Sequence, residues 1–95
     1  MNSPAKRDLL LIFVAYHPSL KEVNTILSCL KSLPLNIGYA VVVNSYQSGE
    51  PVDLLSADAD YFMTNSTNLG YGRAINSLVE YIEDLPQYIG ILNTD

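Results

Sequence analysis

Residues 9–15 read LLLIFVA, and a second apolar run, YAVVV, occupies residues 39–43. Both runs are continuously apolar and rich in branched side chains, which is typical of strands buried on both faces, as in a parallel sheet. Two shorter apolar stretches, residues 60–64 and 88–92, are also expected to form strands. These four segments predict that a sheet forms the centre of the molecule.

Two segments with helical periodicity separate these strands. Ser19 and Glu22 have the spacing of a capping box, in which each side chain satisfies a backbone N–H of the other residue. Pro34 and Pro86 end the two helices, and a third, short helix is expected near residues 51–56. The apolar positions that we expect to face the core are Val23, Ile26, Leu27, Leu30 and Leu33 in the first helix, and Tyr71, Ala74, Ile75, Leu78, Val79 and Ile82 in the second.

The resulting order of elements is β-α-β-β-α-β. Strands that alternate with helices indicate a parallel sheet with crossover connections. We therefore predict an α/β fold with an open, mostly parallel, Rossmann-like sheet, formed by a single domain over residues 1–95.

The composition restricts the classes of function. The chain carries 10 acidic and 5 basic residues, a net charge of −5, which argues against nucleic-acid binding because phosphates require a basic surface. Cys29 is the only cysteine, so an intramolecular disulfide and a cysteine-rich zinc site are excluded. No stretch reaches the roughly 18 to 20 apolar residues of a membrane span, and the run at 9–15 is too short for a signal peptide. We therefore expect a cytoplasmic protein without a membrane span.

Polar residues follow each of the four predicted strands. Ligands of an open parallel sheet bind outside the carboxyl ends of its strands, near the point where the strand order reverses. We therefore expect four separated segments to come together there: residues 16–18, 44–46, 65–73 and 93–95.

The third of these segments contains NLGYGRAIN at residues 68–76. Gly70 and Gly72 lie at the start of the second helix, where backbone N–H groups and the helix dipole favour an anion such as a diphosphate. Arg73 is the only cation in this half of the chain. The alternative is a loop whose glycines serve the turn and whose arginine lies on the surface. A dinucleotide fingerprint is excluded, because Ile75 stands where a third glycine is required.

Asp95 follows the last predicted strand and offers a carboxylate for a hard cation. Mg²⁺ or Mn²⁺ takes oxygen ligands and is usually bound by one or two carboxylates together with substrate phosphates. One aspartate supplies half of such a site. His17 precedes Pro18, and we interpret it as a turn or ligand-contact residue rather than a general base.

The four segments together resemble the nucleotide-sugar-binding half of family 2 inverting glycosyltransferases, which have the GT-A fold. They are most similar to the bacterial rhamnosyltransferase type, over about residues 9–95, and the most specific motifs are NLGYGRAIN and the LNTD of residues 92–95. The resemblance implies transfer of a hexosyl or rhamnosyl group from a dTDP- or UDP-sugar to a saccharide or lipid-linked acceptor, as in polysaccharide biosynthesis.

The resemblance also implies roles for individual residues. Ala15, Tyr16 and His17 would line the pocket for the nucleotide base. Asn44 occupies the position at which the family usually has an aspartate that contacts the base and ribose, so this position departs from the family pattern.

The diphosphate side of the implied site is formed by the later segments. The residues placed along the nucleotide diphosphate are Gly70, Gly72, Arg73 and Asn76. Asn93 and Asp95 correspond to the short acidic metal motif, with Asp95 as the ligand that bridges Mg²⁺ or Mn²⁺ to the diphosphate.

A second departure is that the sequence stops where the family continues. The acceptor-binding half and its catalytic base have no counterpart here, so we expect a shortened chain that binds the donor but does not transfer the sugar efficiently. Two alternatives are a nucleotide-sugar-binding module without catalysis and a structural remnant. In the second case an unpaired sheet edge would join copies of the chain into a homo-oligomer.

Overall fold

The computed structural model describes residues 8–34, 36–47, 49–83 and 85–93. Its elements in chain order are β1 (Leu9–Ala15), α1 (Leu20–Lys31), β2 (Ile37–Val43), the 3₁₀-helix η1 (Pro51–Leu55), β3 (Tyr61–Thr64), α2 (Tyr71–Tyr81) and β4 (Tyr88–Asn93). All seven elements expected from the sequence are confirmed. The helix α1 ends at Lys31, so Leu33, which was expected on its apolar face, lies beyond the helix.

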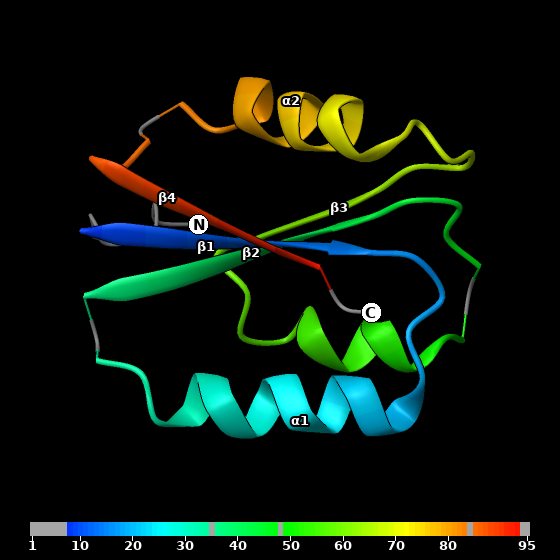
Figure 1. The fold of residues 1–95 in the computed structure, drawn as a ribbon, viewed down its shortest axis with the longest axis horizontal. Helices are drawn as coiled ribbons and strands as arrows, with labels where there is room; N and C mark the ends of the chain where they lie inside the picture. The colour runs from blue at the N-terminus through cyan, green and yellow to red at the C-terminus, as the bar shows by residue number, and fades with distance from the viewer. Residues whose placement is uncertain (1–7, 35, 48, 84, 94–95) are drawn as a thin grey trace.

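The four strands form one parallel sheet in the order β3-β2-β1-β4 (Figure 1). The prediction of an α/β fold with an open parallel sheet is therefore confirmed. The chain adds β2 and β3 on one side of β1 and then returns to place β4 on the other side. This reversal creates a switch point between β1 and β4.

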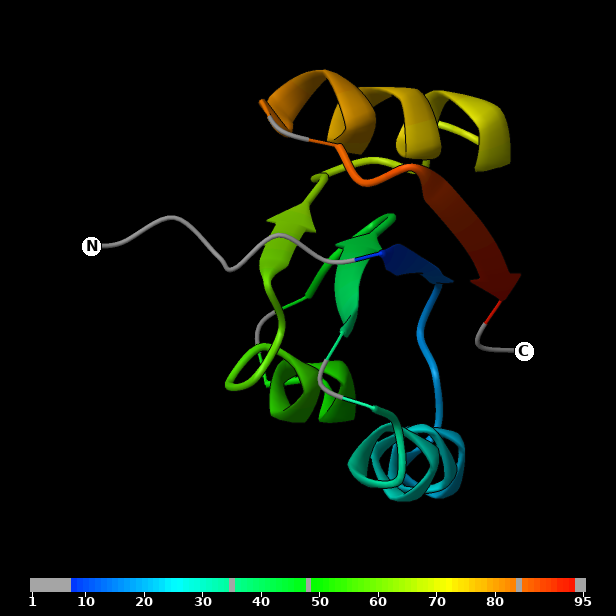
Figure 2. The same cartoon turned by 90° about the vertical axis from the view of Figure 1, so that its left-hand side faces the viewer.

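The helices cover the two faces of the sheet. Helix α1 and η1 lie against one face and α2 lies against the other, as Figures 1 and 2 show. Parallel connections are almost always right-handed, so a connection that runs in the opposite direction along the sheet places its helix on the opposite face. The reversal in strand order therefore explains the three-layer arrangement.

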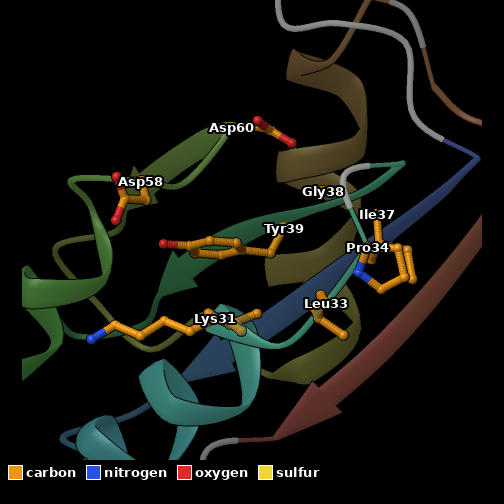
Figure 3. Close-up of a pocket in the computed structure, with 9 residues that line it drawn as sticks. Lys31, Leu33, Pro34, Ile37, Gly38, Tyr39, Asp58 and Asp60 are labelled. Atoms are coloured by element: carbon orange, nitrogen blue, oxygen red, sulfur yellow. The ribbon is translucent and has the colours of Figure 1, made fainter.

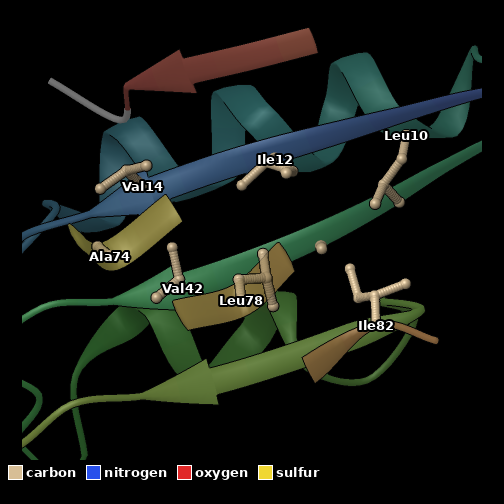
Figure 4. Packing of buried hydrophobic residues seen from close by; sticks show 8 residues of the cluster. Leu10, Ile12, Val14, Val42, Ala74, Leu78 and Ile82 are labelled. Atoms are coloured by element: carbon tan, nitrogen blue, oxygen red, sulfur yellow. The ribbon is translucent and has the colours of Figure 1, made fainter. Parts of the chain in front are cut away.

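Alternate residues of the central strands build two separate cores. In Figure 4, Leu10, Ile12 and Val14 of β1 form one cluster with Leu78 and Ile82 of α2. The other face of the sheet is buried by a second cluster: Phe13, Ala15, Val23, Tyr39, Val41, Val43, Val52 and Leu55. Burial on both faces explains why β1 and β2 read as continuous apolar runs.

The capping box at the start of α1 is confirmed. The Ser19 hydroxyl accepts a hydrogen bond from the Glu22 N–H at 3.1 Å, and the Glu22 carboxylate accepts one from the Ser19 N–H at 2.9 Å. The bond from the Ser19 N–H, and to a smaller extent the Ser19 side chain, favours the ionised carboxylate and so lowers the pKa of the Glu22 carboxyl. The reciprocal bonds determine where the helix begins.

Strand β4 is an apolar edge strand. It pairs with β1 on one side, and the register places Ile89 and Ile91 on the α2 face and Tyr88 and Leu92 on the α1 face. These four side chains are 39%, 44%, 61% and 42% exposed, respectively.

In the part of the chain that the structure describes, no helix is long and apolar enough to cross a membrane.

Candidate functional site at the carboxyl edge of the sheet

Backbone hydrogen bonds continue beyond the strands and join the loops at the carboxyl edge. The Asn44 N–H donates to the Ala15 carbonyl at 2.9 Å, and the Asn65 N–H donates to the Val43 carbonyl at 2.8 Å. The Tyr46 N–H in turn donates to the Asn65 carbonyl at 2.9 Å. The segments that follow β1, β2 and β3 are therefore side by side, as the parallel sheet predicted.

Each of these three segments contains a residue with a positive φ. The angles are 45° for His17, 57° for Ser45 and 83° for Gly70. A side chain makes such a conformation costly, by about 1–3 kcal/mol, and strained residues of this kind gather at functional sites. The two non-glycine cases therefore support a functional interpretation of this edge.

The residues assigned to the base pocket have different environments. Ala15 is fully buried in the core on the α1 face, so only the backbone of this residue belongs to the edge. Tyr16 is 50% exposed, and the centre of its ring lies 4.5 Å from that of His17 in an edge-to-face contact. The two rings form an exposed aromatic surface directly after β1.

His17 forms a hydrogen bond that the sequence did not indicate. Its Nδ1 lies 2.7 Å from Oε2 of Glu50, and the two side chains are 34% and 13% exposed, respectively. The second carboxylate oxygen of Glu50 accepts the Gln47 N–H at 2.7 Å. Glu50 lies 33 positions from His17, and no local pattern distinguishes it from a surface acid. Only the folded chain brings the two together.

Asn44 lies inside the edge rather than on its surface. The residue is 3% exposed, and its side-chain carbonyl accepts a hydrogen bond from the Asn65 amide at 3.3 Å. A buried polar side chain needs such a partner. The geometry assigns Asn44 a structural bond between neighbouring loops, and the ligand contact implied by the resemblance stays a prediction.

The two glycines at the start of α2 differ in conformation. Gly70 is the N-cap, with φ 83° and ψ 161°, and its N–H donates to the Asn68 side chain at 2.9 Å. Gly72 lies in the first turn, has no positive φ, and a methyl group added to it would contact nothing within 4 Å. Turn geometry therefore explains Gly70 but leaves Gly72 unexplained. Arg73 and Asn76 are exposed on the same helix.

The metal motif lies only partly within the described chain. Asn93 ends β4 opposite Val14, which places it at the carboxyl edge beside β1. Asp95 lies outside the described residues. Within the described ranges, no three His, Cys, Asp or Glu side chains gather in a group that could hold a metal ion. The proposal of a divalent cation thus depends on Asp95.

A pocket of about 240 Å³ lies at the opposite, amino edge of the sheet (Figure 3). Its polar lining includes Lys31, Asp58 and Asp60, which surround Tyr39. The Tyr39 hydroxyl donates to the Leu55 carbonyl at 2.9 Å. Burial raises the pKa of Tyr39 to about 12, with smaller contributions from the two aspartates. No sequence prediction concerned this pocket.

No protein-family model, curated protein or solved structure matches the chain. A functional assignment must therefore be argued from the geometry of the carboxyl edge and from the resemblance of its motifs.

Proposed function

We propose that this chain binds a nucleotide-sugar and forms the donor-binding half of a glycosyltransferase of the GT-A type. The observation that carries the proposal is the position of the switch point. The segments that the resemblance assigns to the base and to the metal–diphosphate follow β1 and β4, respectively, and these two strands are neighbours. The resemblance was argued from sequence motifs, whereas the position of β4 beside β1 is a property of the fold.

The proposed ligand is a pyrimidine nucleoside diphosphate that carries a sugar. Its base packs against the exposed Tyr16 ring, because aromatic faces stack on bases of any kind. Its diphosphate lies against the first turn of α2, where backbone N–H groups and Arg73 supply positive potential. Gly72 allows the backbone to approach the phosphates closely. Mg²⁺ or Mn²⁺, held by Asp95, would neutralise part of the phosphate charge.

The experiment that tests the proposal is a titration of the ¹⁵N-labelled chain with UDP and with dTDP, in the presence of Mg²⁺. We expect amide shifts at Tyr16, at Asn44 and around Gly72. Arg73→Ala should weaken binding about tenfold, since a hydrogen bond to a charged group contributes about 1.5 kcal/mol. Lys31→Ala is the matched control, because it removes a cation at the opposite edge. Equal loss in both variants, or no shift at millimolar nucleotide, contradicts the proposal.

The exposed side chains of β4 favour a second candidate function, self-association. Isologous pairing of two β4 strands must be antiparallel, and it would join two sheets into one while covering Ile89, Ile91 and Leu92. A structural role through this edge would need no ligand at the carboxyl edge.

Sedimentation velocity distinguishes the two candidates. If β4 joins two copies, Ile91→Lys should convert a dimer into a monomer, because a charge on an edge strand opposes pairing. Leu54→Lys is the control, since Leu54 is 52% exposed on η1, away from β4. A wild-type chain that stays monomeric at high concentration excludes the self-association candidate.

A further inference from the structure

The bond between His17 and Glu50 determines which nitrogen of the imidazole carries the proton. An ionised carboxylate can only accept hydrogen bonds, so the Nδ1 that lies 2.7 Å from Glu50 must be the protonated nitrogen. In the neutral ring, Nε2 is then an acceptor. No hydrogen bond to Nε2 is found among the described residues, and the side chain is 34% exposed. The imidazole therefore has an acceptor that is accessible to a ligand.

Both residues of the pair are held in place by further contacts. Glu50 is anchored through its other oxygen by the Gln47 N–H at 2.7 Å, and its side chain is only 13% exposed. His17 has the positive φ of 45° and packs its ring against Tyr16. The strained backbone of His17 costs free energy, and the packing of a half-exposed side chain does not explain why this strain is present. The arrangement orients the imidazole beside the surface assigned to the base.

Asn44, the residue implied to contact the base, is poorly exposed for that contact. It is almost completely buried, and its side-chain oxygen already accepts one hydrogen bond, from Asn65. A more exposed residue on the same edge is therefore better placed to accept from the base. His17 lies in the adjacent loop, since the Asn44 N–H donates to the carbonyl of Ala15, two residues before His17.

We propose that Glu50 is a positioning residue that holds His17 in its Nδ1–H tautomer, so that Nε2 accepts the N3–H of a uracil or thymine base. This inference depends on the proposed nucleotide-sugar function and deepens it by assigning base specificity. Uracil and thymine carry a donor at N3, whereas cytosine carries an acceptor there. With a CDP-sugar, N3 of cytosine and Nε2 of His17 would both be acceptors and could not form a hydrogen bond. The pair would therefore select UDP- or dTDP-sugars over CDP-sugars.

The tautomer can be measured without any ligand. The chain contains one histidine, so a ¹⁵N long-range correlation spectrum shows a single imidazole that needs no assignment. At pH 8 we expect a protonated Nδ1 and an unprotonated Nε2. Glu50→Ala should remove this preference, and Glu50→Gln, which keeps an acceptor oxygen, should restore it in part. A protonated Nε2 in the wild-type chain overturns the inference.

The base specificity is tested by comparing the affinities for UDP and CDP. We expect the wild type to prefer UDP at least tenfold. His17→Ala and Glu50→Ala should each bring the ratio close to one, and the double variant should add nothing, because Glu50 acts through His17. Equal wild-type affinities for UDP and CDP overturn the inference while the proposed donor binding stands. Absence of binding by either nucleotide refutes the proposed function itself, whatever tautomer is found.

Discussion

Gly70 and Gly72 lie two residues apart at the start of α2, yet alanine should have opposite effects on stability at the two positions. Gly70 has φ 83° and ψ 161°, a region that essentially only glycine occupies. Apart from the adjoining backbone, no heavy atom lies within 4 Å of the position that a Cβ would occupy at either glycine. Any difference between the two substitutions must therefore come from the backbone and not from a clash.

The magnitudes follow from these conformations. Gly70→Ala should lower the free energy of unfolding by about 1–3 kcal/mol, the cost of a side chain in this region. Gly72→Ala should raise the same free energy by about 0.5 kcal/mol, because alanine is the better helix former. For a domain of this size, 1 kcal/mol corresponds to about 4–8 °C in Tm. We expect a fall of at least about 4 °C for Gly70→Ala and a rise of about 2–4 °C for Gly72→Ala.

The assay is urea unfolding followed by far-ultraviolet circular dichroism, with thermal melts as a second measure. An unchanged m value shows that each variant changes stability rather than the unfolded state. Shifts of the same sign in the two variants would refute the reasoning, since the whole contrast depends on backbone conformation. If Gly72 serves the approach of a diphosphate, Gly72→Ala should also bind UDP more weakly despite its greater stability. A stabilised variant with unchanged UDP affinity would leave Gly72 without a role in binding.

Three further predictions concern the core, the helix cap and the amino-edge pocket. Leu78→Ala should destabilise the chain by about 2–5 kcal/mol because Leu78 is fully buried. Leu54→Ala, at an exposed site, should change stability little. Equal effects of the two substitutions in chemical denaturation would contradict the described core. Ser19→Ala should cost about 1 kcal/mol, measured in the same way, by removing the acceptor of the capping box, and an unchanged midpoint would show that the box contributes nothing. The raised pKa of Tyr39 should stabilise the fold below about pH 10 and lose this contribution as the pH rises through about 12. In Tyr39→Phe the loss of stability that Tyr39 causes at alkaline pH should be absent, which thermal melts at several pH values would measure. An identical dependence of stability on pH in both chains would contradict this contribution from Tyr39.

Secondary structure was predictable because its signals are local. Each signal involves residues close together in the chain: the apolar runs of β1 and β2, the spacing of Ser19 and Glu22, and the helical periodicity before Pro86. The small differences at the boundaries have a similar origin: α1 ends at Lys31 because Ser32 and Leu33 close the last turn with bonds to the carbonyls of Cys29 and Leu30. Periodicity alone does not locate such a terminus.

The candidate site was predictable only as a set of segments. The rule for parallel sheets placed the loops after the strands at one edge, and the hydrogen bonds of Asn44 and Asn65 confirm this for the loops after β1, β2 and β3. The environments within the site were not predictable. Asn44 is buried, Ala15 belongs to the core, and His17 is paired with an acid 33 residues away.

Hydrophobic patterning and capping are short-range properties, so the elements of this protein, their order and the parallel sheet that they form could be predicted from the amino-acid sequence. The folded chain was needed to show that β4 lies beside β1, that the backbone requires glycine at position 70 but not at position 72, and that Glu50 contacts His17. These features depend on packing between segments that are distant in the chain. Many arrangements of the same strands and helices are compatible with one local sequence pattern, and the burial of the two cores selects one of these arrangements.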